Sequence, residues 1–159
     1  MTLVSCMQCP VVIDGKSRVE SSEQMKHLLA ILASSGMVVS ALALRDTSPC
    51  SINERWDCGN VNHSPYAALG GIPVAVIGIV GYLLLGGLAL RSAYRLLLAA
   101  ALPGLAFSLY FAHIEADVLG VWCIYCVASL GVISAITFVV LGTTIIRLIR
   151  KNHATPPGA

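Results

Sequence analysis

Residues 121–146 read VWCIYCVASLGVISAITFVVLGTTII, an apolar run without a single charged residue. A helix that crosses a bilayer needs about 20 mostly apolar residues, so this stretch is long enough to span one. Its opening carries Cys123 and Cys126, which are three positions apart and therefore share one face of a helix. Trp122 and Tyr125 beside them are typical of the membrane–water interface. The sequence predicts a membrane-spanning helix with a pair of thiols at its N-terminal end.

The overall composition also favours a membrane protein. Hydrophobic residues make up 57% of the 159 residues and charged residues only 11%, whereas about a quarter of a soluble domain is charged. The length suits one domain, and a net charge of +2 is too small to indicate a nucleic-acid partner. Residues 1–26 are polar and lack the apolar core of a signal peptide, so we expect the first apolar segment to stay in the protein.

Three more apolar runs precede the one that contains the two cysteines. They are residues 28–44, 72–90 and about 96–114. Backbone that crosses lipid must satisfy its own hydrogen bonds, so each run is expected to form a helix. The predicted fold class is therefore all-α, a polytopic membrane four-helix bundle. The expected division is an N-terminal segment at 1–26, a membrane domain at 27–147 and a disordered tail at 148–159.

Lysine and arginine predict the orientation, because they are enriched in the cytoplasmic loops of membrane proteins. Eight of the ten would lie on one side of the bundle, and only Arg45 and Arg55 on the other. We therefore expect both termini in the cytoplasm, with loop 45–71 and turn 115–120 facing outward. That side is the periplasm of a bacterium or a lumen in a eukaryote, and both are oxidising.

The pair Cys123–Cys126 is best interpreted as a redox centre. A helix N-terminus lowers the pKa of a thiol and favours the reactive thiolate. The alternatives are a structural disulfide or half of a metal site. A disulfide that closes so short a loop adds little stability, because the benefit grows with loop length. We therefore favour redox chemistry.

Cys50 and Cys58 lie in the longest outward loop. They could form a disulfide that pins the loop, but beside a second pair on the same face a shuttle is the better interpretation, since thiolate attack would pass electrons from one pair to the other. A zinc site of all four cysteines is allowed by count, but the lipid boundary and the oxidising compartment disfavour it. Cys6 and Cys9 are expected in the cytoplasm, where they could be a metal half-site, a redox pair or without function, and we favour no essential role.

A disulfide at the membrane surface needs an electron acceptor or donor, and lipid-soluble quinones are the natural choice. An apolar pocket between helices, with a few polar groups, would suit a quinone ring. Ser64 and Tyr125 are candidate polar groups, although Ser64 could instead begin a loop helix with Pro65 at its first position. His113 and Glu115 are expected to be interfacial polar groups, with proton carriers as the alternative.

Taken together, these features resemble the vitamin K epoxide reductase family over residues 27–147. The resemblance rests on the loop pair Cys50-x7-Cys58 and on Ser64 six residues further on. It also rests on the opening of the second helix, Gly71-Ile72-Pro73, and on Trp122-Cys123-Ile124-Tyr125-Cys126 at the start of the fourth. The unrelated four-helix disulfide-forming oxidase of bacteria places its CxxC pair in the first outward loop, so its order is the reverse of the one here.

The resemblance implies a division of labour among the cysteines. Cys126 would react with the quinone, Cys123 would exchange with Cys58, and Cys50 would face a thioredoxin-like partner. The loop would carry a short helix on the outward side that covers the quinone pocket. The candidate quinone contacts are Ser64, Val74, Tyr125 and Leu130.

Two departures bear on the substrate. Vertebrate members have an asparagine near the start of the second helix and a tyrosine four residues past the CxxC, whereas residues 70–80 contain no asparagine and Leu130 takes the other position. Ubiquinone or menaquinone is therefore expected. The expected function is a quinone-dependent thiol oxidoreductase of the bacterial inner membrane, which reoxidises a separate thioredoxin-like protein of the periplasm. The alternatives are a vitamin K quinone or epoxide reductase, and a structural or metal-binding membrane protein with stable disulfides.

Overall fold

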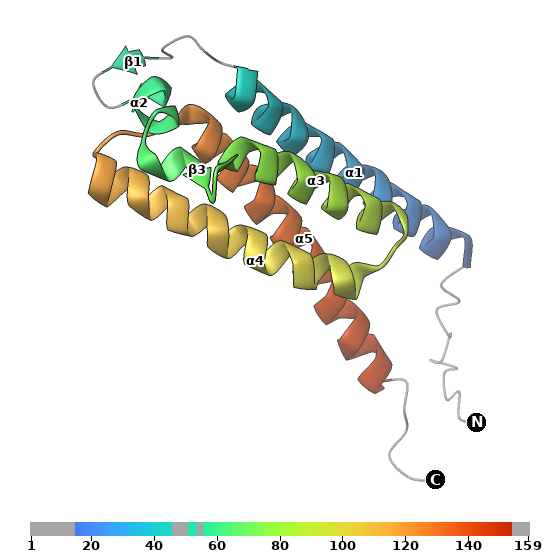
Figure 1. Ribbon diagram of the computed structural model, residues 1–159. Helices are drawn as coiled ribbons and strands as arrows, with labels where there is room; N and C mark the ends of the chain where they lie inside the picture. Colours follow the sequence, from blue (N-terminus) through green and yellow to red (C-terminus); the bar gives the residue numbers. More distant parts are fainter. Residues whose placement is uncertain (1–14, 46–50, 54–55, 154–159) are drawn as a thin grey trace, which may run out of the picture.

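The computed structural model describes residues 15–45, 51–53 and 56–153. Within these residues, four long helices run side by side as a bundle (Figure 1). They are α1 (Gly15–Arg45), α3 (Val74–Leu90), α4 (Tyr94–His113) and α5 (Ile124–His153). Helix α1 packs against α3 and α5, and α4 packs against the same two helices, so the four close into a ring. The predicted all-α bundle is confirmed.

Apolar side chains cover the outer surface of the bundle as well as its centre. Leu29, Leu97 and Val140 are at most 1% exposed and belong to the core. Phe138 on α5 and Leu96 on α4 are 72% and 62% exposed. A large apolar surface of this kind is rare on soluble monomers and suits contact with lipid. The hydrophobic composition therefore arises because apolar side chains cover both the core-facing and the outward-facing surfaces of the helices.

Three described helical segments are long and apolar enough to cross a membrane, namely Glu23–Arg45, Tyr94–Leu119 and Ile124–Ile149. Helix α3 is apolar but has only 17 residues. At the rise of an α-helix it is about 25 Å long, slightly less than the hydrocarbon thickness of about 30 Å. Local thinning of the bilayer accommodates a mismatch of this size. The chain is an integral membrane protein.

Two helices extend beyond the apolar runs that predict them. Helix α1 begins at Gly15, and α5 continues to His153, so residues 148–153 of the expected tail are helical. Residues 154–159, Cys6, Cys9 and Cys50 lie outside the described residues. Helix α4 continues through Pro103 without ending. The start of α1 and the end of α5 lie at the same end of the bundle (Figure 1).

The described part of the chain between α1 and α3 folds over the opposite end of the bundle (Figure 1). It contains, in order, β1 (Ser51–Asn53), β2 (Trp56–Asp57), α2 (Cys58–Asn62), the 3₁₀ helix η1 (Pro65–Ala67), β3 (Ala68–Leu69) and β4 (Ile72–Pro73). Strand β1 pairs antiparallel with β2, and β3 with β4. Gly70 and Gly71 form the turn of the second hairpin at φ values of 61° and 86°, which favour glycine. Helix α2 is the short loop helix that was expected.

Backbone contacts attach this loop to the start of α5. The Asp57 N–H donates to the carbonyl oxygen of Trp122 at 3.2 Å, and Trp56 and Trp122 form a parallel β-bridge. The Asp57 carboxylate also caps α2, because it accepts a hydrogen bond from the Asn60 N–H at 3.1 Å. The same residue thus starts α2 and connects it to the segment before Cys123.

Candidate active site

The last turn of the third span is a π-helix, η2 (Ile114–Leu119), which continues α4 directly. A π-turn accommodates one residue more than an α-turn and is often found at functional sites. Gly120 ends it with a φ of 65° in the left-handed region. Within this turn Glu115 is only 1% exposed, whereas Asp117 is exposed and pairs with His113. The π-turn therefore holds one carboxyl group inside the protein and one outside.

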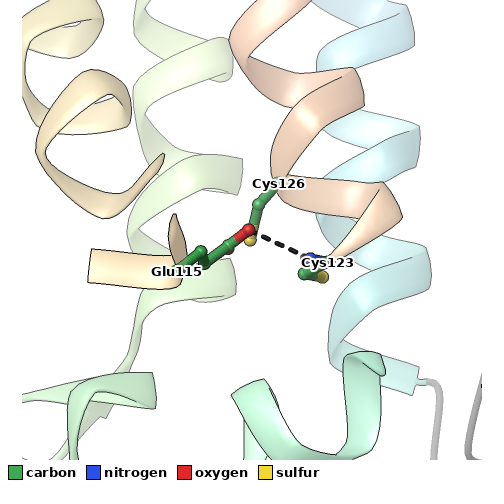
Figure 2. Close-up of side chains that lie close together, drawn as sticks. All are labelled: Glu115, Cys123 and Cys126. Carbon is green, nitrogen blue, oxygen red and sulfur yellow. Dashed lines mark hydrogen bonds between the residues drawn. The ribbon is translucent and has the colours of Figure 1, made fainter. Parts of the chain in front are cut away.

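Glu115 connects the end of the third span to the start of α5. Its Oε2 accepts a hydrogen bond from the Cys123 backbone N–H at 3.0 Å (Figure 2). Its other oxygen, Oε1, is buried and has no hydrogen-bond partner among the described residues. Figure 2 shows the carboxyl group of Glu115 pointing toward both cysteines. The ligand atoms of Glu115, Cys123 and Cys126 all lie within 4.8 Å of one another.

Cys123 immediately precedes α5, Cys126 lies in its first turn, and both are free thiols. The Cys123 carbonyl accepts the first hydrogen bond of the helix from the Val127 N–H at 3.1 Å. Cys123 is 3% exposed, and Cys126 is partly exposed. The structure therefore brings together the two thiols that the sequence pairs.

The surroundings of Cys123 favour its thiolate. A hydrogen bond from the Cys126 thiol is the largest influence, and it lowers the pKa of Cys123 from its usual value. Burial and the charge of Glu115 act in the opposite direction without reversing the shift. Since the thiolate is the form that attacks and leaves in disulfide exchange, Cys123 is suited to exchange with another cysteine.

Cys58 begins α2 and lies in one buried cluster with Cys123 and Val61. It is 2% exposed and is disulfide-bonded. Its partner is neither Cys123 nor Cys126, because both of these are free. Cys58 and the CxxC pair are far apart in the sequence, but they pack together in this cluster at the start of α2.

A cavity of about 830 Å³ lies between the helices and the loop that covers them. Its walls are mostly apolar, and Glu115, Cys123 and Cys126 line it together with Phe107 and Phe111. The lining includes no lysine or arginine among the described residues. The site is thus an apolar chamber with two thiols and one carboxyl group in its wall.

Three of the four candidate quinone contacts line this cavity, namely Ser64, Val74 and Tyr125. Leu130 does not, because it packs against the core of the bundle. The Ser64 hydroxyl donates to the Val61 carbonyl oxygen at 2.7 Å, and Ser64 also precedes η1, which has Pro65 at its first position. Ser64 therefore fits both interpretations made from the sequence.

The sequence predicts Glu115 as an interfacial polar group, with a proton carrier as the alternative, but it does not predict that this residue lies beside the two cysteines. The available signal was a carboxyl group near the end of an apolar span, eight residues before Cys123, since charged residues within spans often have a function. Glu115, Cys123 and Cys126 could also hold a metal ion such as zinc. Zinc usually has four protein or water ligands, and the described residues supply three.

A comparison with known protein families finds a match. The model of the vitamin K epoxide reductase family matches residues 26–141, which is more than half of the chain. The matched region begins in α1 and ends in α5, and it includes Cys58, Glu115, Cys123 and Cys126. No curated protein matches the chain.

Proposed function

Because this chain belongs to the vitamin K epoxide reductase family, a family of quinone-linked redox enzymes, we propose that it transfers electrons from a separate thioredoxin-like dithiol protein to a quinone. The observation that carries the proposal is the buried cluster in which the disulfide-bonded Cys58 meets the free thiol of Cys123. The net result is the formation of disulfides in exported proteins.

The relay consists of successive thiol–disulfide exchanges. We assign Cys50 as the disulfide partner of Cys58. The partner protein reduces this disulfide and becomes oxidised itself. The Cys58 thiolate then attacks Cys123 of an oxidised Cys123–Cys126 pair, and Cys126 leaves. Cys50 next attacks Cys58, which restores the loop disulfide and releases Cys123. Each exchange moves two electrons and breaks one S–S bond for each one formed.

The described state fits the end of this sequence. Cys58 is disulfide-bonded, while Cys123 and Cys126 are both free. The lowered pKa of Cys123 also supports the assignment, because a thiol of low pKa leaves faster from a mixed disulfide. Cys123 is suited to be the group that Cys50 displaces.

The cavity fits a quinone. Its volume of about 830 Å³ is within the range of about 300–1,000 Å³ that is usual for small-molecule sites. Phe107 and Phe111 offer aromatic surface to a ring, while Ser64 and Tyr125 offer polar groups. A bound quinone would supply an acceptor of two electrons and two protons. Cys126 would face it, and ubiquinone or menaquinone is the proposed acceptor.

The proposed orientation places the loop, α2 and the thiols in the periplasm of a bacterium. It is supported by the distribution of lysine and arginine, because eight of the ten fall in residues 16–26, 91–95 and 147–151, and only Arg45 and Arg55 fall at the other end. The two termini would then be cytoplasmic, and the protein would be a multi-pass protein of the inner membrane. An oxidising compartment on the loop side agrees with the disulfide at Cys58.

The test is quinone reduction by the purified protein in the presence of a reduced thioredoxin-like protein. Replacing Cys50, Cys58, Cys123 or Cys126 by alanine in turn should abolish turnover, whereas Cys9→Ala, the matched control, should leave it unchanged. In the Cys50→Ala variant, the mixed disulfide between Cys58 and Cys123 should accumulate, since its resolving thiol is absent. Quinone reduction that persists in the Cys126→Ala variant would show that the proposed relay is wrong.

A further inference from the structure

The carboxyl group of Glu115 takes no part in the exchanges between cysteines, yet it lies buried beside two of them. Burying a polar group costs free energy unless hydrogen bonds compensate it, and the cost is greater for a charge. Here only one of the two oxygens is compensated, by the Cys123 N–H at 3.0 Å, and Oε1 has no partner among the described residues. No lysine or arginine from the described residues lines the cavity to neutralise it.

Holding the start of α5 does not by itself require this residue. Glutamine would offer the Cys123 N–H a carbonyl oxygen at the same reach, without placing an ionisable group in an apolar protein. A buried carboxyl group whose ligand oxygen lies within 4.8 Å of both sulfurs, and which has one oxygen unpartnered among the described residues, therefore points to a chemical function. Glu115 and Cys126 both line the cavity, so a proton on either could reach a molecule bound there.

We propose that Glu115 carries a proton from the Cys126 thiol to the quinone, an inference that rests on the proposed function. In the dithiol state the Cys126 S–H turns from the Cys123 sulfur to the Glu115 carboxylate, the S–H bond breaks, and the proton moves to that carboxylate. The electrons of the two sulfurs reduce the quinone as the Cys123–Cys126 bond forms. The O–H bond of Glu115 then breaks, and its proton joins a quinone oxygen. Solvent supplies the second proton, which replaces the one that Cys123 lost on ionising.

The first test follows oxidation of the reduced Cys123–Cys126 pair by a short-chain ubiquinone in a single turnover. Glu115→Gln retains an oxygen that can accept from the Cys123 N–H but cannot take up the proton. Its rate should fall by at least about 100-fold, the usual contribution of a positioned acid or base. Glu115→Asp should recover part of the rate. Asp117→Asn is the matched control, because its carboxyl group lies on the same π-turn but is exposed, and its rate should equal that of the unmodified chain.

The second test needs no quinone. The infrared S–H stretch of Cys126 is isolated as the difference between Cys123→Ala and the double variant Cys123→Ala/Cys126→Ala. The backbone N–H of residue 123 is still present in both, so Glu115 keeps its anchor. A thiol that donates to the Glu115 carboxylate has its stretch at a lower wavenumber than a free thiol. Adding Glu115→Ala should move the band toward that of a free thiol, whereas adding Asp117→Asn should not.

The outcomes separate this inference from the proposed function. If the unmodified chain is not oxidised by the quinone, the proposed function fails. If the unmodified chain is oxidised, but Glu115→Gln reacts as fast as Asp117→Asn, only the proton carrier is refuted. An S–H band that does not respond to Glu115→Ala would likewise overturn the contact between Glu115 and Cys126. A slow Glu115→Gln variant with the expected band shift supports the proposal.

Discussion

Replacing Gly36 by alanine tests how tightly α1 and α3 pack behind the cavity. A Cβ atom at this position would overlap the ring of Tyr82, and even the ring atom Cδ1 would be only 2.6 Å away. Carbon atoms in contact are normally about 3.5–4.0 Å apart. The ring is 5% exposed, and its hydroxyl donates to the Ser129 carbonyl oxygen at 2.9 Å. It cannot move aside without losing this hydrogen bond.

The expected cost combines two effects. Overpacking of a core costs about 1–3 kcal/mol, and the lost hydrogen bond about 1 kcal/mol. Gly36→Ala should therefore lower the free energy of unfolding by about 2–4 kcal/mol, measured by unfolding in mixed detergent micelles followed by circular dichroism. Gly81→Ala is the control, because a Cβ at that position has no neighbour within 4 Å.

The Tyr82→Ala variant provides a second test of this prediction. When Tyr82→Ala has removed the ring, adding Gly36→Ala should cost almost nothing, so the two substitutions should show strong coupling in a double-mutant cycle. If Gly36→Ala is no worse than Gly81→Ala, or if its cost persists without the ring, then the packing of α1 against α3 is not as described.

Two further predictions concern the thiols. In a chain whose other four cysteines are alanine, the lowered pKa of Cys123 means that its thiolate should form at a lower pH than that of an ordinary cysteine. Cys126→Ala removes the hydrogen-bond donor and should raise the midpoint of the thiolate absorbance, and equal midpoints would contradict the hydrogen bond. For orientation, a membrane-impermeant thiol reagent applied from the periplasmic side should label Cys50 after reduction but neither Cys6 nor Cys9, and the opposite pattern would reverse the proposed orientation.

The spans and the two thiols of α5 could be predicted because they depend on local sequence. An apolar run of sufficient length forms a helix in lipid whatever its neighbours are. Two cysteines three positions apart share a helical face by geometry alone. The bounds were less predictable: the polar turns at Gly15 and His153 are helical although no apolar residues mark them.

The burial of Glu115 could not be predicted from α-helical periodicity. The π-turn adds a residue to the turn and changes which side chains face inward beyond His113. The face of α5 that borders the cavity could not be predicted either. Ser129 and Leu130 are neighbours on α5, yet Ser129 lines the cavity and Leu130 packs against the core. Which of two adjacent residues faces a cavity depends on the helices packed around it.

The hydrogen bond between Asp57 and Trp122 joins the residues that immediately precede Cys58 and Cys123. It therefore fixes the register of the two cysteines as well as bringing their segments together. In the proposed relay, each thiol would meet the other at a high effective concentration, and well-oriented groups can reach effective molarities of about 10⁵ M or more. Small thiols in solution, present at far lower concentrations, would compete poorly for either sulfur. This backbone contact would thus favour electron transfer between the two cysteine pairs over side reactions with small thiols.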